Sequence, residues 1–592
     1  MYALFIFIHS LTMRFLLSLL LCCSIAGAAA QTQWYNPMND SLPFIGGRAW
    51  NKETGTRYHR LPMRAKEMVR PPVWNLACQT AGMYVRFYTN ATTIEVKYKT
   101  TGNLSMPHMP ATGVSGVDLY MTDSNGRRAW CKAKYNFADG ISYVYSNLTY
   151  RNNHARGNEF CLYLPLYNGV KELRIGVPAK SQFSFIPPTR ERPIVIYGSS
   201  VAQGACASRP GMAWTNIVQR MLDAPVVNLG FSGNGQLDES IFRMLSELDA
   251  RLFVIDCMQN MKLERVSLIQ ERITRGVEML RRVSQSPILL VEHDGYMGRD
   301  ASDAERQKYE ATGKELRAAY ERLRLRVSGL YYMTTEEIGL CMDAQVDGIH
   351  PNDLGMQQYA DAYVKKIRSI LYGTDHGTQA YVPCRQRREP DTYEWNARHE
   401  AILDYVRKHQ PEIVMMGNSI THYWGGEPYE KRRAGQRVWN ELFRGTKVVN
   451  MGYGWDRIEN LLWRIEHGEL DGFEARKISV LIGTNNLYTD SDDCIVRGIR
   501  QVVAAIRMQQ PKAVVNVCAI LPRKGMESRI AGINGMLRQW VESDTSLCWT
   551  DATPLLTDKG GRIRSEFFSD GLHPNEKGYE QIATALRRFL SR

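Results

Sequence analysis

Two stretches decide the fold: residues 194–200, which read IVIYGSS, and residues 413–419, which read IVMMGNS. Each is a short apolar run that ends in Gly-x-Ser. Continuous apolar runs of this length are typical of strands buried on both faces of a parallel sheet. A serine that follows such a strand lies at the carboxyl edge of the sheet, where the chain turns into a helix. Both stretches therefore predict an α/β fold with a hydroxyl group at that edge.

The sequence around the two stretches repeats in the same order. About thirty residues after each Gly-x-Ser comes Val-Val-Asn-x-Gly, then a strand that ends near an Asn, and finally Asp-Gly-x-His-Pro. The serine and the histidine are 150 residues apart in one copy and 154 in the other. The matching segments are 226–230 and 448–452, Asn260 and Asn485, and 347–351 and 570–574. An internal repeat of this length predicts two hydrolase modules with the same fold.

The rest of the pattern predicts a multi-domain chain. Short alternating runs at 84–87, 93–98, 117–120 and 173–177 favour an N-terminal all-β sandwich without long helices. Apolar strands, predicted at 194–197, 225–229, 252–255 and 288–291, then alternate with amphipathic helices at 271–283 and 304–325. After a polar stretch the alternation restarts, with strands predicted at 413–416, 447–451, 478–482 and 514–519. We predict a signal peptide at 1–30, a β-sandwich at 31–189, a first hydrolase module at 190–372, a linker at 373–394 and a second module at 395–592.

The repeated residues are those that serine hydrolysis needs. A serine hydroxyl becomes a nucleophile when a histidine takes its proton, and a carboxylate fixes the tautomer of that histidine. We predict Ser200, His350 and Asp347 as nucleophile, base and orienting group in the first module. Ser419, His573 and Asp570 take the same roles in the second. The adjacent carboxylate is expected to raise the histidine pKa above its ordinary value of about 6.5.

Both modules resemble the SGNH (GDSL-like) hydrolases, a family of esterases. The resemblance implies a flavodoxin-like α/β/α fold with parallel sheets and oxyanion donors at Gly233 and Asn260 in the first module. In the second module it implies donors at Asn485 and at Trp455, which replaces the family's glycine and is expected to narrow or block the acyl pocket. Residues 256–261, DCMQNM, depart from G-x-N-D, the family motif that contains the Asn donor.

Two further resemblances concern single regions. Residues 450–456, NMGYGWD, and 462–466, LWRIE, make the second module similar to the catalytic subunits of platelet-activating-factor acetylhydrolase. Residues 116–120, GVDLY, resemble the G-x-D-L-Y signature of a sandwich domain that precedes SGNH modules in exported bacterial esterases. That domain either completes or shields the adjacent site or only packs against it.

The N-terminus predicts export. From Met13, one Arg, an apolar stretch at 15–25 and Ala28-Ala29-Ala30 have the order of a secretory signal, with cleavage after Ala30. Either Met1 or Met13 is the start. The apolar run is too short for a membrane span, and no later segment is long enough. Ten cysteines follow the cut, and several, such as Cys257 and Cys518, are expected to be buried thiols.

The net charge of +13 is scattered rather than gathered in runs, so nucleic-acid binding is not expected. We predict no cofactor and no metal, and we assign a structural or cleft role to Glu292, His293 and Asp294.

Acetylated carbohydrates are the predicted substrates. The alternatives are a lipid acylhydrolase or thioesterase and a glycan-binding protein with inactive modules. Aromatic side chains that could stack on sugars are Trp74, Trp130, Trp214, Trp424 and Trp455.

Overall fold

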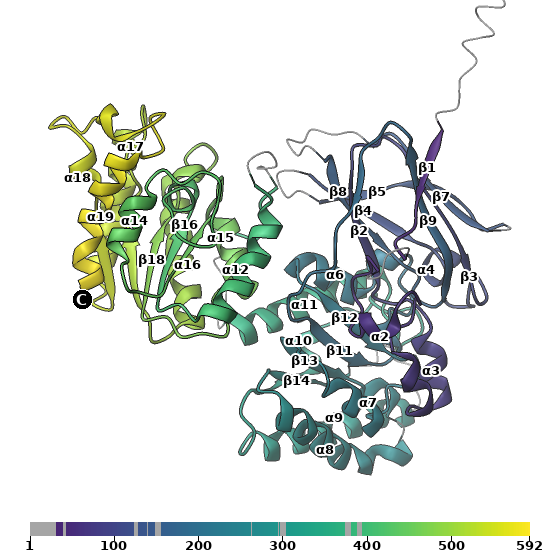
Figure 1. The fold of residues 1–592 in the computed structure, drawn as a ribbon. Helices are drawn as coiled ribbons and strands as arrows, with labels where there is room; N and C mark the ends of the chain where they lie inside the picture. The colour runs from purple at the N-terminus through teal and green to yellow at the C-terminus, as the bar shows by residue number, and fades with distance from the viewer. Residues whose placement is uncertain are drawn as a thin grey trace, which may run out of the picture.

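The computed structural model contains an antiparallel β-sandwich and two parallel α/β domains (Figure 1). It describes residues 31–38, 43–123, 128–138, 140–148, 156–261, 263–293, 295, 303–372, 381–387 and 393–591. The predicted signal peptide lies outside these residues. The predicted fold class, a sandwich followed by two α/β/α domains with parallel sheets, is confirmed. In the described part of the chain, no helix is both long and apolar enough to cross a membrane.

The sandwich consists of two five-stranded antiparallel sheets. Their facing sides form one apolar core, which includes Val85, Phe87, Leu119 and Phe160. The first sheet has the order β1-β9-β3-β7-β6, with strands Thr32–Tyr35, Val170–Pro178, Ile94–Thr100, Ile141–Tyr145 and Ala133–Asn136. The second has the order β10-β2-β8-β4-β5, with strands Phe183–Phe185, Tyr84–Thr89, Asn158–Tyr163, Asp118–Thr122 and Arg128–Cys131.

The first hydrolase module is a five-stranded parallel sheet in the order β12-β11-β13-β14-β15. The strands are Val226–Gly230, Ile194–Gly198, Leu252–Asp256, Ile288–Val291 and Leu330–Met333. The helices are α5 (Ser200–Gln203), α6 (Trp214–Leu222), α7 (Glu239–Leu245), α8 (Ile269–Val283), α9 (Asp303–Leu323), α10 (Thr335–Ile338) and α11 (Asp353–Tyr372). The four strands predicted here and the two long helices are present, whereas β15 was not predicted.

The second module repeats this topology in the order β17-β16-β18-β19-β20. Its strands are Val448–Gly452, Ile413–Gly417, Lys477–Leu481, Val514–Cys518 and Leu547–Thr550. Its helices are α12 (Trp395–His409), α13 (Ser419–His422), α14 (Gln436–Leu442), α15 (Ile458–Glu466), α16 (Asp492–Gln509), α17 (Glu527–Glu542), α18 (Thr553–Leu556) and α19 (Glu576–Ser591). Helix α12 packs through Trp395 and Ile402 on the sheet.

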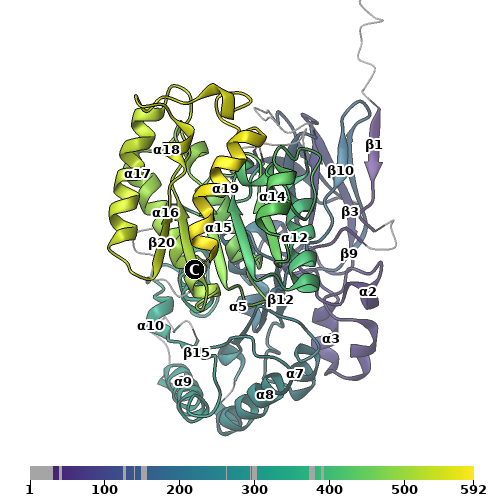
Figure 2. The ribbon, with the colours of Figure 1, turned by 60° about the vertical axis from the view of Figure 1, so that its left-hand side comes forward.

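The first module has no helix of its own immediately before β11. Instead, a segment between β1 and β2 forms α2 (Asn51–Thr54), the 3-10 helix η1 (Met63–Glu67) and α3 (Pro71–Ala77), which the sequence analysis did not predict. Val73 and Trp74 of α3 share a core with Val195 and Tyr197 of β11. Figures 1 and 2 show α3 beside the first module rather than within the sandwich. The N-terminal region thus supplies the helical layer that α12 supplies to the second module.

The described part of the predicted linker contains buried residues, including Tyr381 and 385–387. Residues 381–387 form a segment, called the strap below, whose Arg385 and Arg387 side chains are 6% exposed. Arg385 pairs with Asp223 of the first module at 3.0 Å, and Arg387 pairs with Glu159 of the sandwich at 3.2 Å. The polar composition of the strap therefore reflects buried ion pairs and not a solvated tether.

Candidate active sites

In the first module, the three predicted residues form a continuous hydrogen-bonded set. Ser200 Oγ lies 2.8 Å from His350 Nε2, and His350 Nδ1 lies 2.7 Å from Asp347 Oδ2. The other carboxylate oxygen of Asp347 accepts a hydrogen bond from the His350 backbone at 2.9 Å. The three-residue spacing of Asp-x-x-His therefore allows one carboxylate to fix both the loop and the imidazole.

The second module repeats this arrangement closely. His573 Nε2 lies 2.9 Å from Ser419 Oγ, and His573 Nδ1 lies 2.7 Å from Asp570 Oδ2. The backbone of His573 donates to Asp570 Oδ1 at 2.8 Å. Both sets have the distances that proton transfer from a serine to a histidine requires.

The turn after the first strand places each serine at a helix N-terminus. Ser199 caps α5, where its hydroxyl accepts a hydrogen bond from the backbone of Val201. Asn418 caps α13 in the same way, accepting from Ile420. Because a cap fixes the first turn, the serine that follows it is held at the sheet edge beside backbone N–H groups.

The predicted backbone donors to the oxyanion are Gly233, on the loop after β12, and Trp455, on the loop after β17. Both residues have a positive φ. Gly233 has φ 67° and Trp455 has φ 61°, both in the left-handed region. Glycine adopts this region freely, but a residue with a side chain pays about 1–2 kcal/mol. At Gly233 an added Cβ would meet no atom within 4 Å, and at Trp455 the side chain leaves the residue 54% exposed. The indole therefore presents a face to solvent.

The predicted Asn donors contact the same two loops. Asn260 Oδ1 accepts a hydrogen bond from Gly235 at 3.0 Å, which leaves the amide NH₂ as the end that can donate to a substrate. Asn485 uses its Nδ2 to donate to the Asp456 carbonyl at 2.9 Å. Since an amide nitrogen carries two hydrogens, Asn485 keeps a second donor. Both Asn residues thus lie beside the loop that carries the other donor.

Two side chains that were not predicted, Gln203 and His422, hydrogen-bond to the loops after β12 and β17. Gln203 and His422 each lie three residues after the nucleophile. Gln203 Oε1 accepts from the Ser232 backbone at 3.0 Å, and His422 Nδ1 accepts from the Gly454 backbone at 3.0 Å. Their equal separation in sequence from Ser200 and Ser419 was the signal that could have identified them.

Two buried arginines hold the strand ends that lead into the loops. Arg60, from the N-terminal region, donates to the Gly230 carbonyl at 2.6 Å, and its guanidinium lies 5.0 Å from the Phe231 ring. Arg398 of α12 donates to the Gly452 carbonyl at 2.8 Å and lies 5.1 Å from the Tyr453 ring. No spacing in the sequence relates these arginines, because they reach equivalent positions from different domains.

The surroundings of the second base alter its pKa. Burial lowers the pKa of His573; Asp570 acts in the opposite direction, and the positive charges of Arg432 and Arg523 lower it further. The net direction is downward, so the expected rise was wrong for His573. Burial opposes ionisation of Asp570, but hydrogen bonds from His573 outweigh it and lower the Asp570 pKa to about 2. Asp570 is therefore ionised at neutral pH.

The sandwich domain reaches the first site. His108, in the loop before α4 (Ala111–Val114), lies with its ring centroid 5.7 Å from that of His350. The second site instead has Tyr423 beside its base, with ring centroids 5.5 Å apart. Contact with the base favours a role of the sandwich in completing or shielding the site over one in packing alone.

The predicted group beside β14 is structural in its described part. Glu292 accepts hydrogen bonds from Arg317 at 2.8 Å, from Tyr332 at 2.5 Å and from the Thr335 backbone at 2.9 Å. His293 accepts from the Gly295 backbone at 2.8 Å, and burial lowers its pKa to about 4. Asp294 lies outside the described residues.

Comparison with protein families agrees with this geometry. Residues 191–368 and 415–581, together more than half of the chain, each match the GDSL-like lipase/acylhydrolase family. The chain belongs to this family. Residues 32–183 match the GxDLY family, described as the N-terminus of SGNH-hydrolase-type esterases. The predicted resemblances of the two modules and of the sandwich are confirmed.

Relatives of this GDSL-like protein include two acetylhydrolase subunits. Platelet-activating factor acetylhydrolase IB subunit alpha1 of Bos taurus is 27% identical over 202 residues, 33% of this chain and 83% of the relative. Subunit alpha2 of Homo sapiens is 26% identical over 200 residues, with the same coverage. The crystal structure of a GDSL-like lipase from Bacteroides ovatus ATCC 8483 is 29% identical; the alignment covers 58% of this chain and 98% of that chain, with a TM-score of 0.51.

Proposed function

We propose that this GDSL-like hydrolase is an exported esterase that removes short acyl groups, above all acetyl, from carbohydrates at two separate sites. The observation that carries the proposal is the pair of Ser-His-Asp sets, each with its hydrogen bonds in place between 2.7 and 2.9 Å. A binding protein with inactive modules would not need this geometry in both copies.

The chemistry follows from the contacts. His350 or His573 takes the hydroxyl proton as Ser200 or Ser419 attacks the acyl carbonyl, and Asp347 or Asp570 stabilises the imidazolium. The backbone N–H groups of Gly233 and Trp455, with the amides of Asn260 and Asn485, are our proposed donors to the tetrahedral oxyanion. The histidine returns its proton to the leaving sugar hydroxyl, and water then hydrolyses the acyl-enzyme by the same steps.

Exposed aromatic residues support a carbohydrate substrate. Of the five tryptophans considered above, Trp74, Trp214 and Trp424 are buried, whereas Trp130 and Trp455 are about half exposed. Trp455 follows β17, and Tyr488, 66% exposed, follows β18, so both lie beyond the carboxyl ends of the two strands that flank β16. Flat apolar faces beside a site suit stacking on sugar rings.

A lipid ester is the second candidate, and the acetylhydrolase relatives favour it. Nitrophenyl acetate, butyrate and decanoate, together with an acetylated plant polysaccharide, separate the two. We expect acetyl turnover to exceed butyryl turnover and far exceed decanoyl turnover, with acetate released from the polysaccharide. Equal or faster decanoyl turnover and no release from the polysaccharide would support the lipid reading.

Export is proposed from the sequence of the N-terminal thirty residues, which have the order of a cleaved secretory signal. N-terminal sequencing of protein recovered from the exported fraction is expected to begin at Gln31. Recovery of the chain only inside the cell, with residues 15–25 retained, would contradict this proposal.

A further inference from the structure

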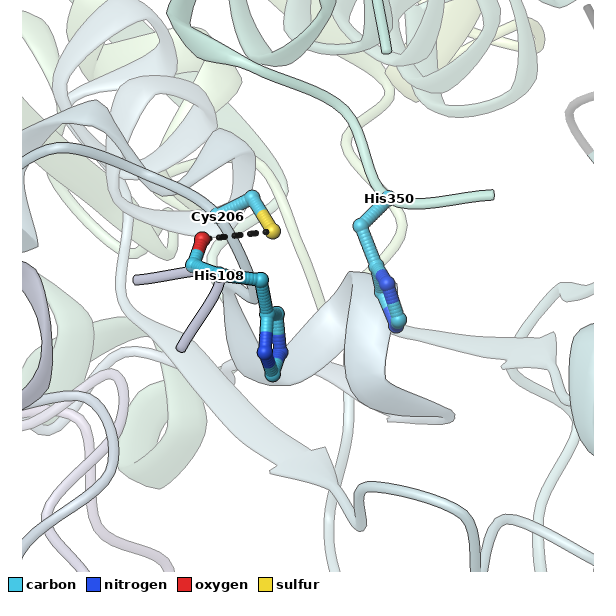
Figure 3. Close-up of side chains that lie close together, drawn as sticks. All are labelled: His108, Cys206 and His350. Carbon is cyan, nitrogen blue, oxygen red and sulfur yellow. Dashed lines mark hydrogen bonds between the residues drawn. The ribbon is translucent and has the colours of Figure 1, made fainter. Parts of the chain in front are cut away.

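Beside the first active site, three side chains with metal-binding atoms converge. They are His108 from the sandwich, Cys206 from the segment after α5, and His350, the proposed base. One ligand atom of each lies within 4.8 Å of the others. Figure 3 shows the two imidazole rings side by side with the Cys206 sulfur near both, and Cys206 Sγ donates to the His108 carbonyl at 3.4 Å.

These atoms form a donor set for a borderline-soft divalent cation. One thiolate and two imidazole nitrogens suit Zn²⁺ and leave a fourth tetrahedral position for water. The partner that such a histidine needs is present, because Asp347 already binds His350 Nδ1 and leaves Nε2 directed away from the carboxylate. His108 is exposed, so a cation can reach the group from solvent, whereas Cys206 is 6% exposed and protected.

We propose that His108, Cys206 and His350 form an inhibitory site for Zn²⁺ or a similar cation that controls the first active site. On binding, the Cys206 thiol loses its proton to solvent, and His350 Nε2 coordinates the metal. His350 then cannot accept the proton of Ser200, so attack on the acyl group stops. This regulation rests on the proposed function, but metal binding itself does not.

The second site keeps the histidine base, His573, but lacks counterparts of His108 and Cys206. Gly425 lies six residues after Ser419, as Cys206 does after Ser200, and Tyr423 lies beside the base. Within the described residues, the group around His350 is the one place where three His, Cys, Asp or Glu ligands meet this criterion. The cation is therefore expected to inhibit one module and spare the other.

Metal binding is tested first, in the Ser200→Ala chain, because this measurement does not depend on activity at the first site. Co²⁺ serves as a spectroscopic probe for Zn²⁺, and Zn²⁺ affinity is measured by calorimetry. We expect a thiolate-to-cobalt absorption band that Cys206→Ala removes and that the matched control Cys341→Ala, at an exposed cysteine of the same module, retains. His108→Asn, at an exposed side chain, is expected to weaken Zn²⁺ binding at least about tenfold, the lower range for losing a metal-site partner.

Inhibition is tested in the Ser419→Ala chain, in which the first site acts alone. Zn²⁺ is expected to inhibit it, EDTA to restore it, and His108→Asn to require at least about tenfold more Zn²⁺. The Ser200→Ala chain is expected to hydrolyse esters equally with and without Zn²⁺.

A cobalt band that survives Cys206→Ala would overturn the proposed metal site. Binding without inhibition, or activation by Zn²⁺, would overturn its regulatory role, and an inactive Ser419→Ala chain with intact binding would count against the proposed esterase function alone.

Discussion

The two hydrolase modules share a sheet order and a Ser-His-Asp geometry but differ in what supports them. In the second module, α12 precedes the sheet in sequence and supplies Arg398 to the end of β17. In the first module, a segment more than one hundred residues upstream supplies α3 and Arg60 to the end of β12. In both modules the loop that carries the backbone donor, called the donor loop below, is held by a buried arginine at the end of the preceding strand. That arginine comes from a different part of the chain in each module.

The largest expected effect tests whether the sites are separate. Ser200→Ala should abolish turnover at the first site and Ser419→Ala at the second, because loss of a triad serine costs on the order of a million-fold. Each single variant should keep the esters that the other site hydrolyses, with the first site acting on the bulkier glycan. Steady-state rates on a panel of esters measure this. A single variant that loses every activity would show that the modules share one site.

A smaller effect is expected when the support of one loop is removed. Arg60→Met should lower kcat at the first site about 10–100-fold, a fraction of the 100–1000-fold cost of losing an oxyanion donor, and should leave KM nearly unchanged. Arg398→Met should do the same at the second site. Each is measured in the chain whose other site carries Ser→Ala.

Arg60→Lys provides the control, since it keeps the charge but makes fewer hydrogen bonds, so partial recovery of kcat is expected. A fall in thermal stability with unchanged kcat would mean that Arg60 stabilises the domain without positioning the loop.

Trp455 and Gly233 offer a matched exchange. Trp455→Gly should raise KM for an acetylated oligosaccharide several-fold while kcat holds, because the exposed ring is lost and the backbone donor stays. It should also stabilise the fold by about 1 kcal/mol, since glycine tolerates φ 61°. Gly233→Ala should destabilise the fold by a similar amount. An increase in kcat on nitrophenyl acetate in Trp455→Gly would instead indicate that the indole narrows the acyl pocket.

The smallest expected effect concerns pH. His573 must be neutral to accept a proton, and its pKa is lowered by burial and by Arg432 and Arg523. Activity at the second site should therefore rise with pH through a midpoint below the ordinary histidine value of about 6.5. Removing a positive charge in Arg432→Gln or Arg523→Gln should favour the protonated ring and move the midpoint upward by a few tenths of a unit. The kcat/KM profile of the Ser200→Ala chain measures both, and a midpoint above about 6.5 would contradict the lowered pKa.

Much of the catalytic geometry could be predicted because it is local and repeated. Gly-x-Ser after an apolar strand and Asp-x-x-His in one loop are short motifs that set their own local geometry. Each motif occurs twice at a matching spacing, which distinguishes the pattern from a chance occurrence. The eight strands predicted in the two sheets are present for the same reason, since continuous apolar runs have few alternatives to burial.

The remainder depended on contacts between distant segments. The α3 helix occupies seven residues and begins with two prolines, so its periodicity was too short to recognise. Arg60 and His108 act on the first module from another domain, and no pattern within either domain indicates where they lie. The pKa of His573 depends on Arg432 and Arg523, which lie 141 and 50 residues away in the chain.

The strap has a consequence for how the tandem can be divided. Gln386 donates to the Gly454 carbonyl at 3.0 Å, one residue before Trp455, while its neighbours Arg385 and Arg387 are paired with Asp223 and Glu159. The donor loop of the second hydrolase is therefore anchored through three consecutive residues to the sandwich and to the first hydrolase. Excising the second hydrolase at residue 393 separates its donor loop from Gln386, while Arg385 and Arg387 stay with Asp223 and Glu159 in the remaining part of the chain. The second hydrolase is therefore not an independent cassette, because a residue outside it holds the loop that carries Trp455.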